Sequence, residues 1–162
     1  MKPNKTLIAF SLGAAVMTAS TVVSASSRID RSIVGAWKTV VTIVNCQTGQ
    51  PVGAPPVIGL STFSLGGTMS EWGIGPGGSP AQRSPSHGVW ERDRGWQEYS
   101  FTFTHYRYDP SGALIGSQKV VADAELAENG DRYTSIAAVD ILDVSNNVVA
   151  AVCATSVGTR IE

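Results

Sequence analysis

The sequence predicts an all-β protein, a single up-and-down antiparallel barrel of about eight strands. Alternation of apolar and polar residues, the period of a half-buried strand, dominates the chain after residue 25, and helical periodicity is scarce. Turn-forming Gly, Pro, Asn and Asp residues separate these runs at even spacing, which favours sequential hairpins over a Greek-key sandwich. A length of 162 residues suits one domain.

The first four expected strands are separated by connections rich in glycine and proline. They cover residues 33–44, 57–63, 68–74 and 87–91. A continuous β-branched run at residues 40–44 marks the first strand, and Gly66-Gly67 ends the second. The long connection at residues 75–86 contains several glycines and prolines, and we expect it to lie over one mouth of the barrel.

The last four expected strands show clearer alternation. They cover residues 96–108, 113–126, 132–142 and 148–159. In the first of these, Tyr99, Phe101 and Phe103 alternate with small hydroxyl residues. Turn residues at 109–112, 128–130 and 145–147 separate the four strands. Sequential hairpins of this kind can close into a barrel that holds one small ligand or is filled by its own side chains.

Residues 1–25 have the pattern of a secretory signal peptide. Lys2 and Lys5 supply a positive start, an apolar stretch follows, and Val23-Ser24-Ala25 offers small residues at a cleavage site. Polar and glycine interruptions make the stretch too short for a membrane-spanning helix, which needs about 20 apolar residues. We therefore expect a secreted or periplasmic protein.

Cleavage after Ala25 would leave one barrel domain over residues 26–162. It would remove two of the 12 basic residues and none of the 13 acidic ones, so the predicted mature chain is mildly acidic. This charge argues against nucleic acid as a partner, since phosphate binding needs a basic surface. No later apolar run is long enough to span a membrane, so we expect no stable membrane insertion after cleavage.

Two short motifs near the ends of the predicted barrel support a family resemblance. The first strand carries Gly35-Ala36-Trp37 and the last carries Gly158-Thr159-Arg160. In these features the chain resembles the lipocalin-like (calycin) barrels. The resemblance implies that Arg160 packs over the Trp37 ring as a cation–π contact that closes one end of the barrel. Residues 83–90 also resemble a segment of secreted bacterial lipocalin-like proteins of unassigned role, which implies a fold and a compartment.

Cys46 and Cys153 are the only two cysteines of the chain. If Trp37 lies opposite Arg160 on antiparallel strands, the same register brings the two cysteines within two residues of each other. Oxidation is expected in an exported protein. We therefore expect a disulfide bond between them, the alternative being two isolated small hydrophobic residues.

The sequence offers no pattern for metal or cofactor binding. His87 and His105 are the only histidines, and they are too far apart in sequence to form a local ligand pair. There is no nucleophile elbow and no glycine-rich phosphate loop followed by a helix. We expect neither a metal nor a cofactor.

Several polar residues remain as candidates for a site. They are Glu71, Arg83, His87, His105 and Arg107. His105 and Arg107 alternate with the aromatic residues of their strand, so we expect both to line the interior. One interpretation is a patch that orients a ligand carboxylate or carbonyl, formed by Arg83, Tyr99, Phe101, Phe103, His105 and Arg107. The other is a self-contained salt-bridge network in which Glu71 pairs with Arg107.

These residues suggest three hypotheses of function. The leading one is an exported barrel that binds a small, largely apolar ligand, because the expected inner faces carry Phe101, Phe103, Leu114, Val120, Ala122 and Ala124. The second is a barrel enzyme, such as a cyclase or isomerase. It would use Glu71 or His87 as a base and Arg83 or Arg107 to stabilise negative charge. The third is a filled-core protein that interacts with another protein.

Overall fold

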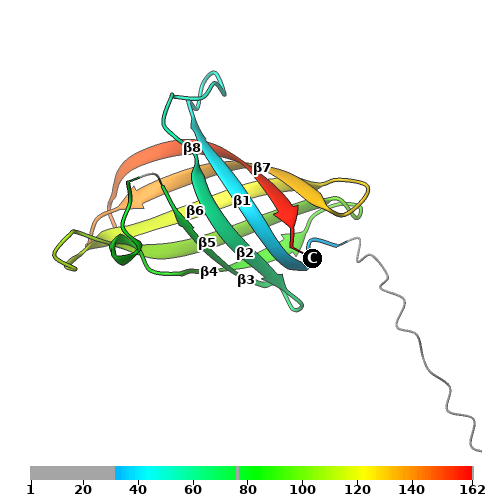
Figure 1. Cartoon of the computed structure of the whole chain (residues 1–162), viewed down its shortest axis with the longest axis horizontal. Helices are drawn as coiled ribbons and strands as arrows, with labels where there is room; N and C mark the ends of the chain where they lie inside the picture. The colour runs from blue at the N-terminus through cyan, green and yellow to red at the C-terminus, as the bar shows by residue number, and fades with distance from the viewer. Residues whose placement is uncertain (1–31, 76, 162) are drawn as a thin grey trace, which may run out of the picture.

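The computed structural model describes residues 32–75 and 77–161, which form one closed β-barrel (Figure 1). The strands are β1 (Gly35–Val44), β2 (Val57–Ser64), β3 (Thr68–Ile74), β4 (Ser86–Arg92), β5 (Glu98–Tyr108), β6 (Leu114–Leu126), β7 (Arg132–Leu142) and β8 (Val148–Arg160). Each strand pairs antiparallel with the next, and β8 pairs with β1 to close the ring. The predicted fold class is confirmed. The expected signal peptide lies outside the described residues.

The largest boundary differences from the sequence prediction occur where strands begin. β1 starts at Gly35 rather than residue 33, and β5 starts at Glu98 rather than residue 96. A turn occupies the residues before Glu98, where the Asp93 amide donates to the Glu98 carbonyl at 3.0 Å. Alternation in the sequence therefore located each strand, but the first residue of a strand depends on the turn that precedes it.

Strands β3 and β4 direct alternate residues into the barrel. In β3, Met69 and Gly73 are buried and Trp72 is exposed, so Glu71 also points inward. β3 pairs Glu71 with Ser86 of β4, which is fully buried, and the next residue, His87, is exposed. The side chain of Glu71 therefore points into the barrel, and that of His87 points outward.

A β-bulge explains why one residue that was expected in the core is exposed. Leu114 was expected to face inward with Val120, but it is 48% exposed. The register between β5 and β6 shifts after Arg107, so that Arg107 pairs with Gly116 and Tyr108 with Leu114. The extra residue reverses the facing of the start of β6. Gly116 has a φ of +138°, and a Cβ there would overlap the Leu142 carbonyl, so glycine is required at the bulge.

Trp37 plugs one end of the barrel, which we call the closed end. Its side chain is fully buried, its Nε1 donates to the Ile33 carbonyl at 2.9 Å, and its ring meets Tyr133 edge-on at 5.0 Å. Arg160 pairs with Trp37 across the β1–β8 ladder, and its guanidinium carbon lies 4.2 Å from the Trp37 ring centroid. The expected cation–π contact is confirmed.

Two glycines make room for this arrangement. A Cβ at Gly35 would lie 2.6 Å from Nη1 of Arg160, and a Cβ at Gly158 would overlap the Tyr133 ring. Gly35 also has a φ of +135°, which side-chain-bearing residues rarely adopt. The glycine of the Gly35-Ala36-Trp37 motif is therefore required so that the arginine can reach the tryptophan.

The other end of the barrel, the open end, carries the disulfide. Cys46 and Cys153 are bonded, with their Cα atoms 5.2 Å apart, and neither is free. β1 pairs Val44 with Cys153, so Cys46 lies two residues further along, as the register predicted. A structural disulfide is typical of a protein in a non-reducing compartment.

Candidate functional site

The barrel interior is not filled by side chains. It holds a cavity of about 300 Å³ that reaches the β3–β4 connection at the open end. Most of its wall is apolar and comes from inward residues of the strands: Val41, Ile43, Val57, Met69, Ile74, Phe101, Phe103, Val120, Ala137, Val139 and Ala154. This volume is at the lower end of the range for small-molecule sites, about 300 to 1,000 Å³.

Most of the candidate site residues line this cavity. They are Glu71, Arg83, Phe101, Phe103, His105 and Arg107. Tyr99 does not line it. It is 1% exposed near the closed end, and its hydroxyl donates to the Trp96 carbonyl at 2.8 Å. His87 lies on the outer face of β4, so the structure does not bring it together with Glu71.

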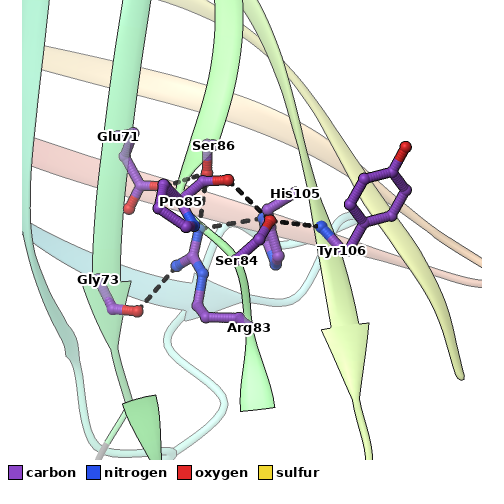
Figure 2. Close-up of polar contacts among 8 residues, drawn as sticks. All are labelled: Glu71, Gly73, Arg83, Ser84, Pro85, Ser86, His105 and Tyr106. Carbon is purple, nitrogen blue, oxygen red and sulfur yellow. Dashed lines mark hydrogen bonds and ion pairs between the residues drawn. The ribbon is translucent and has the colours of Figure 1, made fainter. Parts of the chain in front are cut away.

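Arg83 is the centre of a partly buried polar network (Figure 2). Its Nη1 donates to the Gly73 carbonyl at 2.9 Å. Its Nη2 faces three acceptors: Glu71 Oε2 at 2.6 Å, Ser86 Oγ at 2.8 Å and His105 Nδ1 at 3.0 Å. The Ser86 hydroxyl donates in turn to Glu71 Oε2 at 2.7 Å. The expected pairing of Glu71 with Arg107 is wrong, because Arg83 forms the ion pair with Glu71.

A single turn of 3-10 helix positions Arg83. This helix, η1 (Pro80–Gln82), starts with a capping box in which Ser79 Oγ accepts from the Ala81 amide and Gln82 Oε1 accepts from the Ser79 amide. The chain then docks on β5, where the Ser84 amide donates to the Tyr106 carbonyl and Ser84 Oγ accepts from the Tyr106 amide. The predicted cover over the barrel mouth is therefore a structured segment that sends Arg83 inward.

The contact with Arg83 fixes the state of His105. Because a guanidinium can only donate, Nδ1 of His105 must accept, so the imidazole is neutral with its proton on Nε2. Burial, together with the positive charges of Arg83 and Arg107, lowers the pKa of His105 to about 3. His105 is therefore a neutral member of the network at physiological pH and a poor proton acceptor.

This state predicts a specific pH dependence of stability. Between pH 6.5 and about 3, the unfolded chain binds a proton at His105 that the folded chain does not bind. The free energy of unfolding must therefore fall as the pH falls through this window. From pH 7 to pH 5, we expect the wild type to lose about 2 kcal/mol more than His105→Gln, whose side-chain oxygen can still accept from Arg83. Urea denaturation at both pH values measures this, and parallel losses in the two proteins would contradict it.

Arg107 differs from Arg83 in that its guanidinium has no ion-pair or hydrogen-bond partner among the described residues. It lines the cavity from β5, two residues beyond His105, and only its backbone is paired, to Gly116 and to Arg83. Within residues 32–75 and 77–161, Glu71–Arg83 is the one ion pair, and no hydrogen bond involves the Arg107 guanidinium. The cavity therefore contains one guanidinium bound to the protein and one that is not.

A set of inward hydroxyl groups was missed in the sequence. Ser61 Oγ lies 3.3 Å from the Tyr133 hydroxyl, and Ser135 Oγ lies 2.6 Å from Ser156 Oγ. Thr39 is 4% exposed, and its hydroxyl has no hydrogen-bond partner in the described part of the chain. The signal was available for Thr39, because it is two residues from Trp37 on one strand and so shares its inward face.

Comparisons with known proteins give no family for this chain. No protein-family model matches it, and no curated protein matches it in sequence. Among the described residues, no group of three or more His, Cys, Asp or Glu side chains could hold a metal ion. No helix in that part of the chain is long and apolar enough to cross a membrane. Its function is therefore inferred from the cavity and the side chains around it.

Proposed function

We propose that the protein is an exported, lipocalin-like barrel that binds a small, largely apolar ligand in its interior. The observation that carries this proposal is the cavity of about 300 Å³, lined mostly by apolar side chains. At about 30 Å³ for each water-sized group, this space suits a ligand on the order of ten non-hydrogen atoms. Trp37 blocks the closed end, so a ligand enters past the β3–β4 connection.

The unpartnered hydroxyl of Thr39 supports a binding role. A buried hydroxyl without a partner costs about 1 to 3 kcal/mol. Thr39 lies on the cavity wall, and a Cβ at neighbouring Gly59 would meet both Thr39 Oγ1 at 2.7 Å and Glu71 Oε1 at 3.3 Å. The two oxygens thus flank the same glycine. Among the described residues, neither Thr39 Oγ1 nor Glu71 Oε1 has a hydrogen-bond partner, because the hydrogen bonds of Glu71 are made by Oε2. A ligand with a polar group can supply the missing partner.

Export is supported by two features. The pattern of residues 1–25 is that of a signal peptide, and the disulfide between Cys46 and Cys153 needs an oxidising environment. The lipocalin-like assignment is supported by the stacking of Arg160 on Trp37 at the closed end of an eight-stranded barrel.

Acid–base catalysis finds less support in the geometry. His87 lies outside the barrel, and His105 is neutral with its Nδ1 occupied by Arg83. Glu71 Oε2 is already occupied by hydrogen bonds from Arg83 and Ser86. Binding is therefore the function that this arrangement favours.

A cavity-filling variant tests the proposal. Ala137 lines the cavity and pairs with small neighbours on both sides, Ala122 and Ala154, so the ring of Ala137→Phe must enter the cavity. We expect the wild type to bind 1-octanol, a neutral apolar probe that matches the size of the cavity, in titration calorimetry. Ala137→Phe should bind this probe at least about tenfold more weakly, a loss of about 1.4 kcal/mol.

The neighbouring residue offers a matched control. Ala138 follows Ala137 on β7 but faces outward, so Ala138→Phe adds the same ring outside the barrel and should leave probe binding unchanged. If Ala137→Phe does not fold, Ala154→Phe places the ring in the same space from β8. Equal probe binding by the wild type and a folded cavity-filling variant would contradict an interior site.

A further inference from the structure

The cavity wall carries an unbalanced charge. Five titratable side chains line it: Glu71, Arg83, His105, Arg107 and Tyr133. Glu71 and Arg83 form an ion pair, and His105 is neutral because burial and two nearby arginines lower its pKa to about 3. Burial raises the pKa of Tyr133 to about 12, so this phenol is neutral too. At neutral pH the wall therefore carries one net positive charge, that of Arg107.

The structure around Arg107 does not neutralise this charge. The nearest acidic residue in sequence, Asp109, directs its carboxylate to its own turn, where Oδ1 accepts from the amides of Ser111 and Ala113 and from the Ser111 hydroxyl. Glu71 is held by Arg83 and Ser86. A half-buried guanidinium is costly unless an anion pairs with it.

We propose that the natural ligand is a small apolar monocarboxylic acid whose carboxylate is bound by Arg107. This inference rests on the proposed function and adds the chemical class of the ligand. The planar guanidinium fork matches a carboxylate with two parallel hydrogen bonds. A monoanion balances the single free charge of the wall, whereas a phosphate monoester would bring a charge of about −1.5 to −2.

The position of Arg107 fixes the orientation of the ligand. Arg107 lies near the end of β5 at the open end, and Phe103 and Phe101 follow it inward on the same face at four and six residues. At about 3.3 Å per residue, this face runs roughly 20 Å from Arg107 to Phe101. The carboxylate therefore lies at the mouth and the apolar body points inward, over two phenyl rings that stack with centroids 6.2 Å apart.

Two probes of equal size separate charge from shape. Octanoate and octanamide each have ten non-hydrogen atoms, and they differ in whether the head group is ionised. Titration calorimetry with the full, exported protein measures both affinities. We expect octanoate to bind at least about tenfold more tightly than octanamide, because a charge-assisted pair with Arg107 is available to the acid alone.

Substitutions of Arg107 test whether this side chain causes the preference for octanoate over octanamide. In Arg107→Gln the preference for octanoate should fall to about twofold or less while octanamide binding is retained, and Arg107→Lys should keep part of it because it keeps the charge. Lys119→Gln is the control, since Lys119 is an exposed cation on the adjacent strand β6 and should leave the ratio unchanged.

The possible outcomes separate this inference from the proposed function. Equal affinity of the wild type for the two probes, or a preference that persists in Arg107→Gln, overturns the acid inference and leaves an apolar binding barrel. Failure of the wild type to bind any of the three probes, octanoate, octanamide and 1-octanol, overturns both proposals. A preference for octanoate that Arg107→Gln abolishes and Lys119→Gln retains supports the assignment.

Discussion

Removal of the disulfide by Cys46→Ala together with Cys153→Ala is expected to lower the free energy of unfolding by about 4 to 5 kcal/mol. The bond joins residues 107 positions apart, so it excludes a large set of open conformations from the unfolded chain. In the loop-entropy description, a loop of about 100 residues corresponds to about 4.7 kcal/mol. This is a large fraction of the stability of an ordinary domain, about 5 to 15 kcal/mol.

Urea denaturation of the exported protein measures this effect. With a denaturant slope of about 2 kcal/mol per molar, the midpoint of the double variant should fall by roughly 2 to 3 M. The wild type in reductant provides the control, since its midpoint should then approach that of the variant. Equal urea midpoints of the wild type and the double variant without reductant would show that the disulfide does not restrict the conformations of the unfolded chain.

Arg160→Ala is expected to cost about 3 kcal/mol, although it removes no apolar residue from the core. Its guanidinium stacks on Trp37 and donates hydrogen bonds to the backbone carbonyls of Ser32, Val34 and Gly130 at 2.7 to 2.8 Å. A desolvated cation–π contact is worth about 2 kcal/mol, and hydrogen bonds to a charged group about 1.5 to 3 kcal/mol each. Their effects are not additive, so we expect less than their sum.

Thermal denaturation tests this expectation, with a fall in Tm of roughly 10 °C. Arg132→Ala is the matched control because Arg132 lies on the adjacent strand, is exposed, and pairs through its backbone with Thr159. It should change Tm little. An equal effect of the two substitutions would mean that the closed end depends on charge in general and not on the Arg160–Trp37 contact.

The sequence predicted the barrel closure well because closure depends on register. Once Trp37 is placed opposite Arg160, every other pair on β1 and β8 follows by counting, and the pairing of Val44 with Cys153 agrees with that count. The inward facing of His105 and Arg107 followed from the same rule of alternation, since no bulge interrupts β5 before Arg107.

The polar network could not be predicted in the same way. Hydropathy misleads in β3, because the apolar Trp72 faces outward and the charged Glu71 faces the interior. Glu71 is tolerated inside because Arg83 reaches it, and Arg83 comes from a connection whose path is set by the capping box at Ser79 and by docking to Tyr106. These contacts join residues that have no periodic relation in the sequence.

The pairing of β1 with β8 has a kinetic consequence. Every other ladder joins consecutive strands and closes a loop of modest length, whereas this one joins strands that lie at opposite ends of the described chain. The entropy of closing a loop grows with its length, so we expect this ladder to be the last to zip during folding and the first to open. Each end of the β1–β8 ladder is stabilised by its own contact. The Cys46–Cys153 disulfide lies at one end, and the stacking of Arg160 on Trp37 lies at the other. These two constraints therefore act at the ladder that we expect to form last.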